Sequence, residues 1–149
     1  MIVVLGADHR GFAMKASLAE WLRAKGYTVE DVGAAELHPE DDYPDFGAAV
    51  GRAVAGNPEA RGIVLCGSGA GIAIAANKIP GVRAFTATEP VIVRAARCDD
   101  NANVLAIAAD HTRDDMAKIL AAIFLETPFE ADERFVRRIE KIQHLEHAR

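Results

Sequence analysis

The sequence has few cysteines, no long apolar run and no excess of basic residues. Its two cysteines, Cys66 and Cys98, lie in different segments and give no disulfide framework. No apolar run approaches the roughly 20 residues that a membrane-spanning helix needs. A net charge of −5 argues against a nucleic-acid-binding surface, which would be basic and clustered. Because the amino terminus also lacks the features of a signal peptide, we expect a cytoplasmic protein that binds neither membrane nor nucleic acid.

Internal repeats, linkers and low-complexity tracts are missing too, so we expect residues 1–149 to form a single domain with a hydrophobic core. Strands are predicted at 2–5, 27–32, 63–66, 81–86 and 103–108, of which the first and third are continuous apolar runs. Helical spacing predicts helices at 12–25, 44–55, the alanine-rich run up to 78, 90–97, 113–125 and 132–146. Strands that alternate with helices predict right-handed crossovers, and therefore an α/β fold with a doubly wound parallel sheet of about five strands.

The segment 63–78 is the one around which the predicted site is organised. Its buried strand ends at Cys66, three glycines follow at alternate positions, and an alanine-rich helix begins after them. Such a turn leaves backbone N–H groups unpaired at the positive end of a helix, which favours an anion site, and Cys66 lies beside it. The alternative is a plain glycine turn with an inert buried cysteine. A dinucleotide fingerprint fits poorly because Ile72 replaces its last glycine, and Lys78 comes too late for a phosphate P-loop.

Acidic and histidine side chains follow two other predicted strands. Asp8 and His9 come after the first strand, and Asp110 and His111 come after the fifth. In doubly wound sheets ligands bind at the carboxyl ends of the strands, so these residues and Cys66 are expected to meet. Each has a structural alternative: Asp8 or Asp110 could cap the following helix, and His9 could be an ordinary loop residue. A metal site built from the two pairs is a weaker possibility, because no zinc-type spacing supports it.

Two further features have plain and functional interpretations. Arg134, Arg138 and Lys141 form a basic row on the last predicted helix, beside an apolar row that would dock it. The basic row could simply be a solvent-exposed face of the helix. Its functional interpretation is an anion clamp, because arginine binds phosphate or carboxylate with two hydrogen bonds. The second feature is the polar stretch 97–103, which leads into the fifth strand and could be no more than a connecting loop.

On these motifs the chain resembles the type B ribose-5-phosphate isomerase family, which also contains the galactose-6-phosphate isomerase subunits. The matching segments cover nearly the whole chain in order and are 6–12, 42–45, 66–72 with 75–78, 88–90 and 103–105. The resemblance implies a Rossmann-like α/β/α fold and aldose–ketose isomerisation without a cofactor or a metal. It also implies a homodimer or homotetramer with active sites shared between subunits, with the last helix packed on a partner.

The resemblance also implies roles for individual residues. Cys66 would move the proton between C1 and C2, and Asp8, with the Ser68 hydroxyl nearby, would shuttle protons between the two oxygens. The remaining implied positions are substrate-binding ones, namely His9, Tyr43, Gly67, Gly69, Ala70, Gly71, Arg134 and Arg138. Isomerisation needs a base, a proton relay and stabilised oxyanions, so this set is chemically coherent.

Two departures from the family pattern bear on the substrate. Where the family usually has His-Asn, with the histidine assigned to sugar ring opening, this chain has Asp99 and Asp100. Asp99 would then be the catalytic candidate there, and Asp100 would contact substrate. Where the family usually has a phosphate-binding arginine after the fifth strand, this chain has Asp110, with Arg113 three residues on. Either Arg113 substitutes for that arginine, or the substrate differs from the common pentose 5-phosphate.

The leading hypothesis is therefore a cofactor-independent aldose–ketose isomerase of a sugar phosphate, with ribose 5-phosphate and ribulose 5-phosphate as the first pair to test. A tetrose phosphate or a non-phosphorylated sugar acid is the alternative substrate. From a different class, the chain could be a non-catalytic partner subunit that binds a sugar phosphate. The expected partners are thus a small sugar ligand and further subunits.

Overall fold

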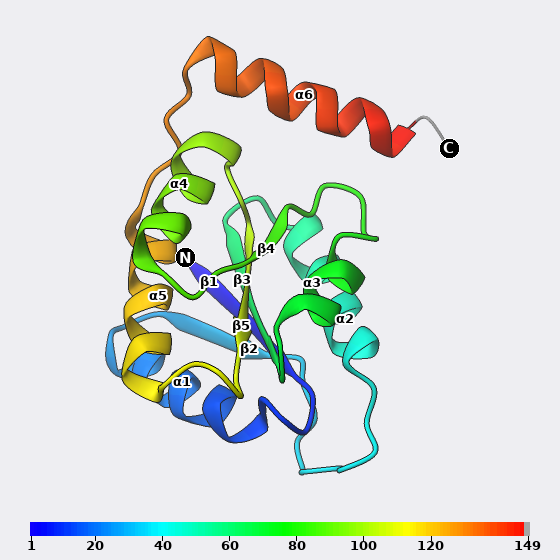
Figure 1. Ribbon diagram of the computed structural model, residues 1–149, viewed down its shortest axis with the longest axis vertical. Helices are drawn as coiled ribbons and strands as arrows, with labels where there is room; N and C mark the ends of the chain where they lie inside the picture. The colour runs from blue at the N-terminus through cyan, green and yellow to red at the C-terminus, as the bar shows by residue number, and fades with distance from the viewer. Residues whose placement is uncertain (148–149) are drawn as a thin grey trace.

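Five strands form one parallel sheet in the order β2-β1-β3-β5-β4 in a computed structural model that describes residues 1–147 (Figure 1). The strands are β1 (Ile2–Ala7), β2 (Thr28–Asp31), β3 (Ala60–Cys66), β4 (Ala84–Thr86) and β5 (Val104–Ala108). Every neighbouring pair is parallel. The predicted α/β fold with a five-stranded doubly wound sheet is confirmed.

Helices cover both faces of the sheet and make it a three-layer structure (Figure 1). They are α1 (Phe12–Ala24), α2 (Tyr43–Ala55), α3 (Ala70–Ala76), α4 (Pro90–Asp100), α5 (Asp114–Glu126) and α6 (Glu133–His147). The α1 and α5 helices lie on one face, and α2 and α3 on the other. Within residues 1–147, none of these helices combines the length and the apolar character that crossing a bilayer requires.

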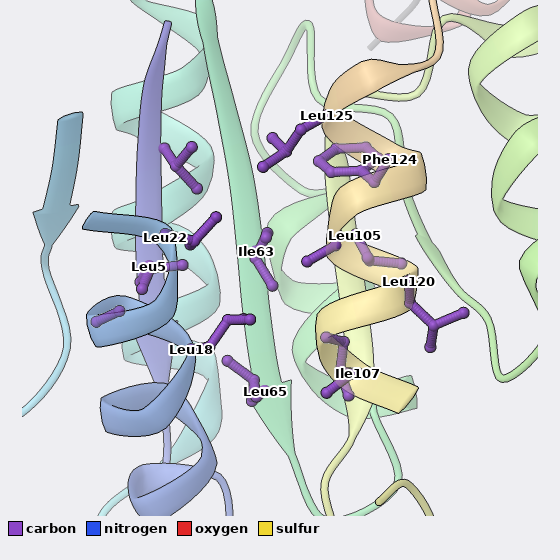
Figure 2. Close-up of a cluster of buried hydrophobic side chains, with 14 of the residues drawn as sticks. Leu5, Leu18, Leu22, Ile63, Leu65, Leu105, Ile107, Leu120, Phe124 and Leu125 are labelled. Carbon is purple, nitrogen blue, oxygen red and sulfur yellow. The ribbon is translucent and has the colours of Figure 1, made fainter. Parts of the chain in front are cut away.

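The core consists of two apolar layers because successive strand residues point to opposite faces of the sheet. Leu5, Leu65 and Ile107 are fully buried against α1 and α5 (Figure 2). Their neighbours Val64 and Ala106 are equally buried, on the side of α2 and α3. Strands buried on both faces explain why the sequence shows continuous apolar runs instead of alternation.

The strands differ from the prediction mainly at their amino ends. The β3 strand begins at Ala60 because residues 60–62 already pair with β1. The β4 strand begins at Ala84, whereas the sequence predicted it from 81. Gly81 adopts φ +83° and donates its N–H to the Glu146 carboxylate at 2.9 and 3.0 Å, so it cannot continue the strand.

The α4 helix continues to Asp100, so interpreting 97–103 as a connecting loop was wrong for its first half. The reason is Arg97, whose side chain is buried and donates to the carbonyl oxygens of Thr127 and Ala102 at 3.2 and 2.5 Å. These bonds tie the last turn of α4 to the chain after α5. Burial lowers the pKa of Arg97 to about 10, and repulsion from Arg61 and Arg83 adds to the effect. The helix ends at Asn101, whose φ of 46° is left-handed.

Candidate active site

The carboxyl ends of β1, β3 and β5 surround a pocket of about 420 Å³ at one edge of the sheet. Because β3 lies between β1 and β5, the loops that follow the three strands are neighbours. The pocket is lined by Asp8, Arg10, Tyr43, Cys66, Gly67, Ser68, Gly71, Asp110 and His111. The structure therefore brings together the three strand ends that the sequence singled out.

Cys66 ends β3 at the floor of this pocket, and only 4% of it is exposed. The chain turns through Gly69, whose φ of 74° is left-handed, and the Gly69 N–H donates to the Cys66 sulfur at 3.2 Å. Among residues 1–147, the amides of Gly67 and Ser68 have no hydrogen-bond acceptor, whereas the Ala70 amide donates to the Ser68 hydroxyl at 3.3 Å. The turn thus keeps two free N–H groups beside the sulfur.

Asp8 begins the turn after β1 and is almost fully buried. Its Oδ1 accepts the amides of Arg10 at 3.0 Å and Gly11 at 3.1 Å, one residue before α1 begins. Asp8 is therefore not the N-cap of α1, which is Gly11 without a side-chain cap, but its carboxylate holds the turn that leads into the helix. The same side chain lines the pocket with Cys66, so holding this turn also places a carboxyl group in the pocket.

His9 is paired with Asp41, a partner that sequence reasoning missed. Asp41 Oδ1 accepts the His9 amide at 2.9 Å and lies 2.8 Å from its Nδ1. A proton on Nδ1 is therefore held by the carboxylate, which leaves Nε2 as the free ring nitrogen. Asp41 immediately precedes the predicted 42–45 motif, but nothing in the spacing pointed to His9, which lies 32 residues earlier.

Tyr43 and the glycine turn form the opposite wall of the pocket. The Tyr43 ring is so close to Gly71 that a Cβ added at Gly71 would lie 2.6 Å from Cζ. The side chain is 41% exposed and lines the pocket, as the resemblance implied. Gly69 ends the turn and Ala70 begins α3, and neither lines the pocket.

Arg10 and Asp110 form an ion pair at the mouth of the pocket, which the sequence analysis did not anticipate. Asp110 does not cap the next helix, because α5 begins only at Asp114. Arg113, the expected substitute for the family's arginine, is 85% exposed, pairs with Asp115 and is not part of the pocket lining. The charges at this edge therefore differ from the expected ones.

Four predicted site residues lie at the other end of the molecule. Asp99 and Asp100 end α4, which leads into the amino end of β5, roughly 13 Å along that strand from the pocket edge. Arg134 and Arg138 are exposed on α6, which lies across the end of the molecule opposite the pocket edge (Figure 1). Within one copy of the chain, these four residues therefore do not lie near Cys66.

The described residues show how α6 is held in place. Phe135 and Ile139 of the predicted apolar row are buried, whereas Ile142 is 40% exposed. Glu146 binds the Gly81 amide, and the helix contacts α4.

Nowhere in residues 1–147 do three or more His, Cys, Asp or Glu side chains gather as a metal ion would require.

Comparison with known proteins relates this chain to a known group. The sequence model described as "Ribose/Galactose Isomerase" matches residues 3–142. The chain is 38% identical over 147 residues to ribose-5-phosphate isomerase B of Mycobacterium tuberculosis, covering 98% of this chain and 90% of that one. It is 32% identical over 145 residues to D-erythrulose-4-phosphate isomerase of Pectobacterium atrosepticum, covering 97% and 95%.

A solved structure is similarly close. Ribose-5-phosphate isomerase B from Mycoplasma genitalium, crystallised with bound ribulose-5-phosphate, superposes with a TM-score of 0.95 at 35% identity. The match covers 99% of this chain and 97% of that one. The likeness therefore extends over the sheet, all six helices and the loops around the pocket.

Proposed function

The chain belongs to the ribose/galactose isomerase family, and from this premise we propose that it interconverts the aldose and ketose forms of a sugar phosphate without a cofactor. Ribose 5-phosphate and ribulose 5-phosphate are the leading pair, because relatives at 38% identity are named for that reaction. The observation that supports the proposal most directly is the buried thiol of Cys66, which shares a pocket with Asp8 and free backbone amides.

Cys66 serves as the base in this proposal. Its sulfur takes the proton from the carbon beside the carbonyl, and the C–H electron pair becomes the double bond of an enediolate. The proton returns to the neighbouring carbon, which exchanges the positions of carbonyl and hydroxyl. The hydrogen bond from the Gly69 amide can be kept while the sulfur carries negative charge.

The other pocket residues handle the oxygens of the substrate. The free amides of Gly67 and Ser68 donate to the oxygen on which negative charge develops, because preorganised donors contribute most to the rate there. Asp8 moves a proton between the two oxygens, with the Ser68 hydroxyl beside it. Isomerisation conserves the oxidation state of the whole sugar, so the balance needs no external reductant.

A tetrose phosphate is the second candidate substrate. Asp99 stands where the resemblance implies a ring-opening histidine, and substrates that are already open-chain would not need that step. The 32% identical relative from Pectobacterium atrosepticum is named for such a four-carbon substrate.

The active site is proposed to be shared between two copies of the chain. In one copy Arg134, Arg138, Asp99 and Asp100 lie far from Cys66, so they can reach a pocket only on a partner. The α6 helix supports this, because Val136, Ile142 and Leu145 on it are 36–72% exposed. In the other functional class, a non-catalytic partner subunit would bind the sugar phosphate and exchange no protons.

The test is hydrogen exchange catalysed by the purified chain. We expect it to introduce solvent deuterium into C1 or C2 of ribose 5-phosphate or of a tetrose phosphate, and Cys66→Ala to abolish this. Cys98→Ala is the matched control for the loss of a thiol, because Cys98 does not line the Cys66 pocket of its own copy, and exchange should persist in it. If Cys66→Ala retains more than about a tenth of the wild-type rate, Cys66 is not the base, since losing one costs roughly 100-fold or more.

A further inference from the structure

The Arg10–Asp110 ion pair spans the end of β3. Arg10 follows β1 and Asp110 follows β5, and β3 lies between these strands, so the pair closes over the start of the glycine turn. Two observations place it directly above Gly67. A Cβ added at Gly67 would lie 2.6 Å from the Arg10 Cζ and Nε, and the Asp110 amide donates to the Gly67 carbonyl at 3.1 Å.

The Arg10 guanidinium has N–H groups that bind no acceptor among residues 1–147. Of its five N–H groups, only those on Nη2 have a partner among residues 1–147, which is Asp110. The Arg10 side chain is 57% exposed, whereas that of Asp110 is 30% exposed. Asp110 therefore fixes one side of the guanidinium, and Nε and Nη1 remain available to a ligand.

Charge makes Arg10 the distinctive residue of the pocket. Within the described part of the chain, it is the sole arginine or lysine among the lining residues, which also include the carboxyl groups of Asp8 and Asp110. Among the lining residues of one copy, these two acids would repel an anionic substrate if Arg10 were absent. A planar guanidinium with two free donors suits a phosphate, which it binds through parallel hydrogen bonds.

We propose that Arg10 binds the phosphate group of the substrate, and that Asp110 is a positioning residue that holds the guanidinium over Gly67. This inference rests on the proposed function for the identity of the substrate. It assigns the phosphate contact of this pocket to the loop after β1, and not to Arg113, whose side chain points to solvent and pairs with Asp115. The site is therefore specific for phosphorylated over free sugars through a residue that sequence reasoning did not select.

The experiment measures binding and turnover in one set of variants. Arg10→Gln should raise KM for the phosphorylated substrate roughly 10- to 100-fold, as expected for losing a charge-assisted hydrogen bond, with kcat changed less than about threefold. The dissociation constant of inorganic phosphate, measured by calorimetry, should rise by a similar factor. Arg23→Gln removes the same charge from the exposed last turn of α1 and should change neither value.

The double variant Arg10→Gln/Asp110→Asn separates contact from simple repulsion. Arg10→Gln alone leaves Asp110 unpaired, which would repel phosphate even if Arg10 never touched it. The double variant removes both charges, so under the proposal it still binds phosphate at least about tenfold more weakly than the wild type. Recovery of wild-type binding in the double variant would overturn the proposal.

Two other results would also overturn it. The first is an unchanged KM in Arg10→Gln, which would make the pair purely structural. The second is a loss of kcat at constant KM, which would put the guanidinium on the reacting oxygens. Phosphate binding needs no turnover, so a wild type that binds phosphate through Arg10 without isomerising any sugar would refute the proposed function and leave this inference standing.

Discussion

Asp99 is the residue from which the substrate preference is expected to follow. Opening a sugar ring needs a proton on the ring oxygen, and a carboxyl group is ordinarily ionised at neutral pH, whereas an imidazolium can donate. The names of the relatives favour ribose 5-phosphate, but an aspartate at position 99 predicts a higher kcat/KM for the second candidate, a tetrose 4-phosphate. Its esterified O4 cannot close a furanose ring, whereas ribose 5-phosphate closes one through O4. Asp99→His should raise kcat/KM for ribose 5-phosphate roughly tenfold or more, because a positioned acid contributes at least that much.

The control for this prediction changes another acid to the same residue. Asp115→His alters an exposed side chain on α5 and should leave both substrates unaffected. If ribose 5-phosphate is the better substrate of the wild type and Asp99→His does not raise kcat/KM, the aspartate at position 99 does not determine the choice of substrate.

Residue pairs were the part of the site that the sequence could not predict. The strand ends located Asp8, Cys66 and Asp110, because buried runs and parallel topology determine where loops meet. The contacts of His9 with Asp41 and of Arg10 with Asp110 join residues 32 and 100 positions apart. Periodicity carries no information about which side chains meet across two loops.

At the scale of elements, the turn between β1 and α1 depends on the lack of a side chain at Gly11. A Cβ there would lie 2.6 Å from Leu65 Cβ and 2.8 Å from the Leu65 carbonyl oxygen, which is backbone and cannot move aside. We predict that Gly11→Ala lowers the free energy of unfolding by about 1–3 kcal/mol, the usual cost of overpacking, as measured by urea denaturation.

A matched glycine shows whether crowding is the cause. Gly56 has an ordinary φ of −79°, and a Cβ added there would approach nothing closer than 3.5 Å. Gly56→Ala should therefore change stability by less than about 0.5 kcal/mol or raise it slightly. Equal losses in the two variants would contradict the argument from close packing.

The elements themselves were predicted with uneven success, for physical reasons. All five strands and six helices were expected, because buried strands and amphipathic helices have strong periodic patterns. The ends of β4 and α4 were wrong, because tertiary contacts decide them. Gly81 is held by Glu146 from α6, and Arg97 by carbonyls from two other segments.

At the scale of the whole molecule, the proposed sharing of sites between copies has a direct test. Cys66→Ala and Arg138→Ala would each damage both sites of a dimer, but a mixed dimer would contain one intact site. Subunit exchange between the two variants should therefore restore about a quarter of the wild-type activity at a substrate concentration well below KM.

The control pairs two variants from the same side of the site. Mixing Cys66→Ala with Asp8→Asn should restore no activity, because Cys66 and Asp8 line one pocket of one chain, and no mixed dimer has an intact site. If mixing Cys66→Ala with Arg138→Ala is equally ineffective, the basic row of α6 does not complete a neighbouring pocket.

The parallel pairing of distant strands also determines when the pocket can form during synthesis of the chain. The pairing of β1 with β3 joins Ile2 to Ala60, and that of β3 with β5 joins Gly62 to Val104. A ribosome delivers the chain from its amino terminus at about 5–20 residues per second. Cys66 is therefore synthesised several seconds before Asp110 and the strand that walls its pocket, and until then the thiol has no enclosure. The part of the molecule that handles the substrate is among the last that translation can complete.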